Sequence, residues 1–153
     1  MAIKILRKEC AGDGRAMARF RREAKALRFI SHPNIVELID AGRTHEGDVY
    51  LVLELLVGRD LEVYIAQEAP IPPRSAAGMM SALCRGLVAI HEKGVIHRDI
   101  KPSNVLRFGA TAQSKLSDFG VAFAHERGAM PYEEGSVVGT PAFMAPEQFD
   151  SDW

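Results

Sequence analysis

The residue types most able to do chemistry gather in two loops in the second half of the chain. Residues 97–104 read HRDIKPSN, and Asp118 is followed by Phe119 and Gly120. These loops offer carboxylates, a lysine and an amide, and carboxylate and amide oxygens are the ligands that a hard cation such as Mg²⁺ prefers. An aspartate in such a loop can also simply cap a turn. Either aspartate alone is therefore only a weak sign of a reactive site.

A third carboxylate, Glu23, stands where the pattern predicts a buried face. Residues 14–30 have a helical period, and Glu23 falls on the same stripe as Phe20 and Leu27. A buried carboxylate is costly unless a cation meets it. We therefore expect Glu23 to have a cationic partner.

The elements that must position these residues follow from the apolar periodicities. Strands are expected at residues 2–6, 35–41 and 49–55, with a hairpin turn at 42–48. Gly58 is expected to break the chain before a short helix at 60–67. A longer helix is expected at 75–93, with its inward side chains being Met80, Leu83, Leu87 and Ile90. Short strands are expected at residues 95–96, 105–106 and 115–116.

The composition is that of an ordinary globular protein and excludes several classes. The chain has 153 residues, a formal net charge of −1 and 47% hydrophobic residues, which argues against disorder and fibrous repeats. Residues 1–30 carry nine basic and three acidic residues, best interpreted as the solvated face of a helix rather than a nucleic-acid patch. No membrane span or secretory signal is recognised. Cys10 and Cys84 lack metal-type spacing, so a cytoplasmic location is expected.

The loop motifs, taken together, resemble those of the eukaryotic-type (Hanks-type) protein kinase family. HRDIKPSN at 97–104, DFG at 118–120 and APE at 145–147 occur in the family's order and at its separations. The resemblance implies an α+β, bilobal protein-kinase-like fold in truncated form. Residues 1–56 would be a partial N-lobe of three strands and helix C, and residues 57–153 a partial helical C-lobe. It also implies transfer of the γ-phosphoryl group of MgATP, with ATP and Mg²⁺ as cofactors.

The resemblance assigns catalytic roles to individual residues. Asp99 would orient the substrate hydroxyl and accept its proton, and Lys101 would steady the transferring phosphate. Asn104 and Asp118 would be the Mg²⁺ ligands. Thr140 would hydrogen-bond to the catalytic aspartate and lysine.

The phosphate-binding lysine of the family maps to Lys4. It stands in Ala2-Ile3-Lys4, which matches the end of the family's VAIK strand. The family's partner for this lysine, on helix C, maps to Glu23. The resemblance and the inward carboxylate therefore point to the same ion pair.

The adenine pocket of the family can also be placed on this sequence. Its positions are the gatekeeper Leu53, the hinge residues Glu54 to Leu56, the ring-contacting Ala2 and Leu106, and the ribose-contacting Asp60. For the apolar members, ordinary core packing holds at the same time.

Two of the motifs indicate which type of hydroxyl the substrate carries. Lys101-Pro102-Ser103-Asn104 and Gly139-Thr140-Pro141 have the serine/threonine form rather than the tyrosine form. HPNIVEL at 32–38 and GTPAFMAPEQF at 139–149 resemble the bacterial Hanks type. Protein substrates bearing serine or threonine are the expected partners, and a homodimer would serve autophosphorylation.

Regulation by phosphate is a hypothesis that the resemblance adds. Arg98, before the catalytic aspartate, marks kinases controlled by phosphate on the activation segment, and Ser136 lies where such a phosphate often falls. Arg19, on the helix near Glu23, could join Arg98 in binding it. Alternatively Ser136 is a plain loop serine, and mass spectrometry of protein incubated with MgATP distinguishes these interpretations.

The resemblance extends over residues 1 to about 149, which we expect to be the middle of a kinase domain. The strands and Gly-rich loop before Lys4 and the later C-lobe helices are not matched, so the isolated piece is expected to be poorly stable and weakly active. Two alternatives to a protein kinase stay open. One is a truncated module that binds nucleotide or a partner with little or no catalysis. The other, disfavoured by the APE segment, is a small-molecule phosphotransferase.

Overall fold

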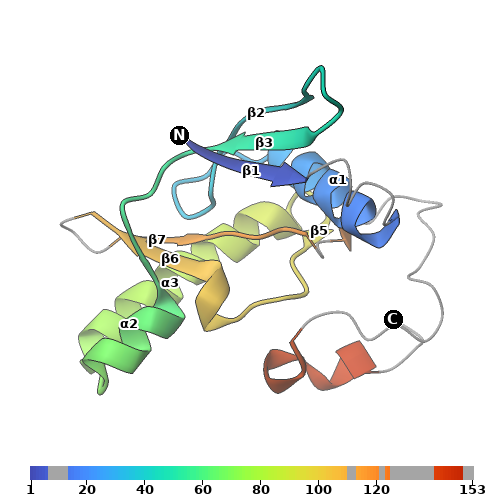
Figure 1. The fold of residues 1–153 in the computed structure, drawn as a ribbon. Helices are drawn as coiled ribbons and strands as arrows, with labels where there is room; N and C mark the ends of the chain where they lie inside the picture. Colours follow the sequence, from blue (N-terminus) through green and yellow to red (C-terminus); the bar gives the residue numbers. More distant parts are fainter. Residues whose placement is uncertain (7–13, 110–112, 121–122, 125–139, 150–153) are drawn as a thin grey trace.

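A three-stranded antiparallel sheet and one helix form the first part of the computed structural model. The structure describes residues 1–6, 14–109, 113–120, 123–124 and 140–149. Strands β1 (Ala2–Leu6), β3 (Val49–Leu53) and β2 (Leu38–Arg43) are arranged in the order β1-β3-β2. Helix α1 (Gly14–Arg28) lies beside this sheet, which sits above the rest of the molecule in Figure 1. The expected first strand is thus confirmed.

Helix α1 buries the stripe that its sequence predicts. Phe20 and Leu27 are buried, Ile30 is buried just beyond the helix end, and Glu23 between them is only 2% exposed. The opposite face carries the arginines, so the amphipathic interpretation of the basic cluster agrees with the structure. A carboxylate is therefore placed at the inner surface of α1.

The second strand begins later than its apolar run predicts. A strand is expected over residues 35–41, but β2 starts at Leu38, and Ile35 instead forms an isolated parallel bridge with Leu116. Val36 N donates to Leu116 O at 2.9 Å, and Leu116 N donates to Asn34 O at 2.9 Å. This short stretch is diverted because its backbone pairs with a distant strand rather than with the hairpin partner. The third strand also ends at Leu53 rather than at residue 55.

The second part of the molecule consists of two helices and two small sheets. The helices are α2 (Leu61–Glu68) and α3 (Pro73–His91). One sheet has the order β4 (Gly58–Asp60), β6 (Val105–Phe108), β7 (Gln113–Leu116), and the other pairs β5 (Val95–Ile96) with β8 (Phe123–Ala124). Single 3₁₀ turns follow at η1 (Pro102–Asn104), η2 (Pro141–Phe143) and η3 (Pro146–Phe149). In Figure 1 β6 and β7 lie below the first sheet, with α3 crossing behind them and α2 below them.

Gly58, expected to be a break before the next helix, is instead the first residue of strand β4. It pairs with Phe108, and a Cβ added at Gly58 would lie 1.9 Å from the carbonyl oxygen of Arg107. The glycine therefore allows the backbones of β4 and β6 to approach closely. The helix that follows starts at Leu61, one residue later than predicted, because Asp60 is its N-cap and accepts a hydrogen bond from Val63 N at 2.8 Å.

Helix α3 faces the core with one methionine different from the prediction. Leu83 and Ile90 are buried as expected, but Met80 is 51% exposed and Met79 is buried instead. Met79 lies four residues before Leu83, and its sulfur accepts a contact from Arg107 Nη1 at 3.1 Å. Both methionines fit a helical period, so tertiary contacts with β6 decide which one is inside.

One hydrophobic core joins the two parts. Its most enclosed members, all 0–1% exposed, are Leu27 from α1, Ile35 before β2, Ile90 from α3, Leu116 from β7 and Phe119. These residues place the loop after β7 between α1 and the lower helices, which fixes where Asp118 lies. Within the described ranges, no helix has the length and apolar content needed to cross a membrane.

Candidate active site

The carboxylate of Asp99 is the centre of a compact hydrogen-bonded cluster. Lys101 Nζ lies 2.9 Å from Asp99 Oδ2 and donates to Thr140 Oγ1 at 2.8 Å. Thr140 Oγ1 in turn donates to Asp99 Oδ1 at 3.0 Å. The structure thus brings Asp99, Lys101 and Thr140 together although Thr140 is 41 residues away in sequence.

The side chain of Asn104 also binds Asp99 within the same loop. Its Nδ2 donates to the backbone oxygen of Asp99 at 2.8 Å and to Asp99 Oδ2 at 3.0 Å. Ser117 donates its backbone N–H to Asn104 O at 2.9 Å and its hydroxyl to the same oxygen at 3.1 Å. Because Ser117 immediately precedes Asp118, these bonds connect the loop of Asp99 to the loop of Asp118.

These contacts lower the pKa of Asp99. Burial alone would raise the pKa of the carboxyl above its ordinary 3.8, but the hydrogen bonds from Lys101, Thr140 and Asn104 outweigh burial and lower it. Asp99 is therefore ionised at neutral pH. An ionised carboxylate can accept a hydrogen bond from a hydroxyl brought beside it.

Two residues of the site have a left-handed backbone although neither is glycine. The φ angle of Arg98 is 65° and that of Asp118 is 60°. Such conformations cost about 1–3 kcal/mol each and persist only where surrounding contacts determine them. Both lie directly at the residues with chemistry, one just before Asp99 and the other at Asp118 itself.

His97 is buried beneath this cluster and links its two loops. It is 1% exposed, its Nε2 lies 3.0 Å from Ser117 O, and its Nδ1 accepts from Asp99 N at 3.3 Å. Its ring also meets Phe119 edge-on at 4.7 Å between centroids. Burial lowers the pKa of His97 below its ordinary 6.5, which the hydrogen bond to Ser117 only partly offsets. The neutral ring therefore donates from Nε2 and accepts at Nδ1.

Lys4 and Glu23 form the second centre of the site. Lys4 Nζ donates to Glu23 Oε2 at 2.6 Å and to Asp118 Oδ1 at 3.4 Å. The Glu23 side chain is 3% exposed, whereas that of Lys4 is 44% exposed. The buried carboxylate on α1 thus has the cationic partner that its position requires.

Burial and the opposite charge of the partner have opposing effects on the pKa values of Lys4 and Glu23. Burial lowers the pKa of Lys4, but the hydrogen bonds and charges of Glu23 and Asp118 outweigh it and raise the pKa. Burial raises the pKa of Glu23, against the pull of Lys4. Lys4 is accordingly a firmly protonated amine with part of its surface open to solvent.

The predicted adenine-pocket residues fall into two adjacent pairs. Ala2 pairs with Leu53 across β1 and β3, and Asp60 pairs with Leu106 across β4 and β6. Leu56 lies on the connection between these sheets and is half-buried. The Asp60 carboxylate already caps α2 through one oxygen.

Glu54 has a side-chain function that its predicted hinge position does not suggest. Its Oε1 accepts from the backbone N–H of Glu37 at 2.9 Å and forms an ion pair with Lys115. Glu54 N also donates to Glu37 O at 3.1 Å. These bonds connect the end of β3 to β7 and so brace the connection at residues 54–56.

The donor set at Asn104 and Asp118 suits Mg²⁺. The amide nitrogen of Asn104 donates twice to Asp99, so its amide oxygen is the atom that could bind a cation, and the Asp118 side chain is 52% exposed. Among the described residues there is no cluster of three or more His, Cys, Asp or Glu side chains that could enclose a metal. One carboxylate and one amide oxygen match a cation that keeps water and shares substrate oxygens.

The residues of the regulatory hypothesis are only partly described. Arg98 lies in the loop of Asp99, and Arg19 is on α1 near Gly120, where an added Cβ would lie 3.9 Å from Arg19 Cβ. Ser136 lies outside the described residues. The phosphate-binding cluster therefore stays a prediction.

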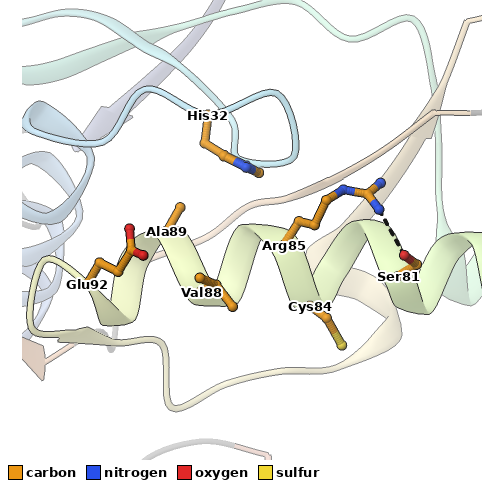
Figure 2. A pocket seen from close by; sticks show the side chains of 7 residues that line it. All are labelled: His32, Ser81, Cys84, Arg85, Val88, Ala89 and Glu92. Atoms are coloured by element: carbon orange, nitrogen blue, oxygen red, sulfur yellow. Dashed lines mark hydrogen bonds between the residues drawn. The ribbon is translucent and has the colours of Figure 1, made fainter.

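A groove on α3 lies apart from the site. It has a volume of about 420 Å³ and contains none of the predicted site residues. Figure 2 shows His32, from the loop after α1, above α3, with Arg85 hydrogen-bonded to Ser81. Its lining residues are His32, Ser81, Cys84, Arg85, Val88, Ala89 and Glu92.

Comparison with known proteins shows to which family the chain belongs. The model of the protein kinase domain family matches residues 1–152. The chain belongs to the protein kinase family. The expected α+β kinase-like fold is confirmed by this match and by the sheets and helices described above.

The curated relatives of this kinase chain are bacterial serine/threonine-protein kinases. It is 40% identical over 151 residues to the serine/threonine-protein kinase PkaA of Streptomyces coelicolor, covering 96% of this chain and 27% of the relative. It is 37% identical over 149 residues to PrkC of Bacillus subtilis, covering 97% and 22%. It is 36% identical over 155 residues to PknB of Mycobacterium leprae, covering 99% and 25%. The chain thus spans about a quarter of the length of these relatives, and the Hanks-type serine/threonine assignment is confirmed.

Sequence reasoning missed several residues that hold this kinase site in place. His97 and Ser117 join the two loops, and Gln148 donates its Nε2 to the backbone oxygen of Arg98 at 3.0 Å. A histidine and a serine inside the motif loops could have been singled out from sequence. Gln148 gives no such signal, because nothing local indicates that its side chain reaches a loop 50 residues away.

Proposed function

We propose that this kinase chain transfers the γ-phosphoryl group of MgATP to serine or threonine hydroxyls of protein substrates. The observation that carries the proposal is the Asp99 cluster: an ionised carboxylate whose oxygens are fixed by Lys101, Thr140 and Asn104. In this proposal residues 1–56 and 57–153 are two lobes, and the nucleotide lies between them against Ala2, Leu53, Leu56 and Leu106.

Each residue of the site contributes a distinct step. The Asp99 carboxylate accepts a hydrogen bond from the substrate hydroxyl and takes its proton as the oxygen attacks the γ-phosphorus. The bond from that phosphorus to the β,γ-bridging oxygen breaks, and ADP leaves. Lys101, already within hydrogen-bond distance of Thr140, places positive charge beside the moving phosphoryl group.

The amine of Lys4 and the metal ligands position the nucleotide. Lys4, fixed by Glu23, presents its partly exposed amine to the α- and β-phosphates. Asn104 and Asp118 would hold Mg²⁺, which neutralises charge on the phosphate oxygens. The Lys4–Asp118 contact at 3.4 Å keeps the phosphate-binding lysine and the metal-binding carboxylate adjacent before substrate binds.

The experiment that tests this function is a phosphate-transfer assay with radiolabelled MgATP and a generic basic protein substrate. Asp99→Asn is the decisive variant, because the amide keeps the shape but cannot take a proton. We expect its rate to fall by about 10²- to 10⁴-fold, the usual contribution of a general base.

A matched control replaces an exposed carboxylate of similar chemistry, Glu62→Gln on α2. Its rate should equal that of the wild-type chain. Nucleotide binding without any phosphate transfer by the wild-type chain would instead support a binding module. Equal incorporation by wild type and Asp99→Asn would also contradict the proposal.

A further inference from the structure

The peptide group between Arg98 and Asp99 is fixed at both of its polar ends. Its N–H, which belongs to Asp99, donates to His97 Nδ1 at 3.3 Å. Its carbonyl oxygen, which belongs to Arg98, accepts from Gln148 Nε2 at 3.0 Å. This is the peptide from which the Asp99 side chain departs, so its orientation helps to set the direction of the carboxylate.

The contact on the carbonyl end comes from a side chain that is itself held. Gln148 Oε1 accepts from Ala145 N at 3.1 Å, and Gln148 N donates to Ala145 O at 2.9 Å. With both ends of its amide engaged, Gln148 has a defined rotamer and amide orientation. The half-buried Gln148 side chain is therefore held in one orientation, unlike a flexible surface side chain.

Arg98, whose carbonyl oxygen accepts from Gln148, has a backbone conformation that needs support. Arg98 has a φ angle of 65°, a conformation that costs a non-glycine residue about 1–3 kcal/mol and that surrounding contacts must maintain. The segment of residues 140–148 grips the loop at two successive positions: Gln148 holds the main chain of Arg98, and Thr140 holds the side chain of Asp99. The two contacts fix the direction of one carboxylate.

We infer that Gln148 is a positioning residue that aims Asp99 through the Arg98–Asp99 peptide. The inference rests on the proposed function, because it assigns Gln148 a part in the same transfer step. Gln148 touches no reacting atom, so its loss lowers kcat while the KM for ATP, set by Lys4 and the hinge, changes little.

The decisive variant is Gln148→Glu. It keeps the shape of the side chain, and its charge state decides whether it can donate a hydrogen bond to the Arg98 oxygen. As a carboxylate it still accepts from Ala145 N but meets the Arg98 oxygen with a second acceptor. As a neutral acid it can donate to that oxygen. An ordinary glutamic acid has a pKa near 4.3, and a neighbouring carbonyl oxygen raises it. Acidic pH should therefore restore the lost contact.

The experiment measures kcat and the KM for ATP of the full chain between about pH 5.5 and 8, relative to wild type at each pH. We expect kcat of Gln148→Glu to be about tenfold below wild type at pH 8, with KM within about twofold, because small displacements of a reacting group are costly. The ratio to wild type should rise as the pH falls. Gln148→Leu should be equally slow at every pH, and the exposed control Gln113→Glu should match wild type throughout.

Wild-type kcat in Gln148→Glu at pH 8, a ratio that does not change with pH, or a loss confined to KM would overturn the inference. Circular dichroism of each variant shows that it is folded, and Gln148→Leu carries the kcat and KM comparison if Gln148→Glu does not fold.

Failure of the proposed function has a different signature, namely no phosphate transfer by wild type itself. Amide hydrogen exchange of residues 97–101 then decides the contact. Faster exchange in Gln148→Glu than in wild type at pH 8, with a smaller ratio at pH 5.5, supports it, and equal exchange overturns it.

Discussion

The carboxylate of Asp99 and the amine of Lys4 differ in how many contacts fix them and in where those contacts come from. Asp99 is bonded by three side chains, two of them within five residues along the chain. Lys4 lies on β1, which among the described residues pairs with β3, and is held by Glu23 and, at longer range, Asp118. The Asp99 region can therefore lose one contact and keep its shape, whereas the Lys4 region depends on a single buried carboxylate.

Among variants that leave Asp99 itself in place, the largest effect is expected in the Lys4 region. Lys4→Met should lower kcat/KM by about 10²-fold, because the nucleotide phosphates lose their positioning cation. It should also destabilise the fold by about 3 kcal/mol or more, because it leaves the 3%-exposed Glu23 side chain without its partner. Phosphate-transfer kinetics and urea unfolding measure these two quantities.

The matched variant removes the other half of the same pair. Glu23→Leu should lose comparable activity but little stability, because the lysine left behind is 44% exposed and leucine suits the buried stripe of α1. An unfolding free energy lower in Glu23→Leu than in Lys4→Met would contradict the view that burial of the carboxylate dominates this region.

A smaller effect is expected in the Asp99 region. Thr140→Ala removes one of the three side chains bonded to Asp99 and should lower kcat about tenfold, the equivalent of one hydrogen bond to a charged group. Thr140→Ser keeps the hydroxyl and should recover most of the rate. A loss in Thr140→Ala as deep as that of Asp99→Asn would show that the contacts around Asp99 are not redundant.

The smallest expected effect is the dependence of the free energy of unfolding on pH that is caused by His97, the buried histidine next to Asp99. The pKa of His97 is lowered on folding from its ordinary 6.5, so the unfolded chain takes up this proton first as the pH falls. The contribution of neutral His97 to the free energy of unfolding is therefore fully present above about pH 6.5. It decreases below that pH, by about 1.4 kcal/mol per pH unit at most.

Urea unfolding at pH 7.5 and 5.5 measures this loss. His97→Phe should be less stable at pH 7.5 but should show a smaller loss on acidification. His45→Phe, with a side chain 92% exposed, should keep the wild-type dependence. An identical acid loss in His97→Phe would assign it to other groups.

The sequence predicts those parts of the site that depend on local spacing or on a recognisable cost. Asp99 and Asn104 stand five residues apart in one motif, so both residues are recognised from the sequence, and the structure joins them by a hydrogen bond. Glu23 is a carboxylate on an apolar stripe, and the free-energy cost of burying it is enough to predict a cationic partner. The predicted helix of Glu23 and the predicted first strand also match α1 and β1, because both predictions depend only on local sequence.

The features that sequence reasoning missed depend on contacts between distant segments. Met79 and Met80 both fit the inner face of α3, and the approach of Arg107 decides between them. The run at residues 35–41 has strand composition, but Ile35 pairs with Leu116, a bridge that no local pattern reveals. Gln148 likewise acquires its partner only when the chain folds back on the loop of Arg98.

The bridge at Leu116 has a mechanical consequence. Two backbone hydrogen bonds, from Val36 N and to Asn34 O, fasten the segment before β2 to the strand that leads to Asp118. Asp118 stands two residues after Leu116, so these backbone hydrogen bonds couple the position of its carboxylate to the segment that leads into β2.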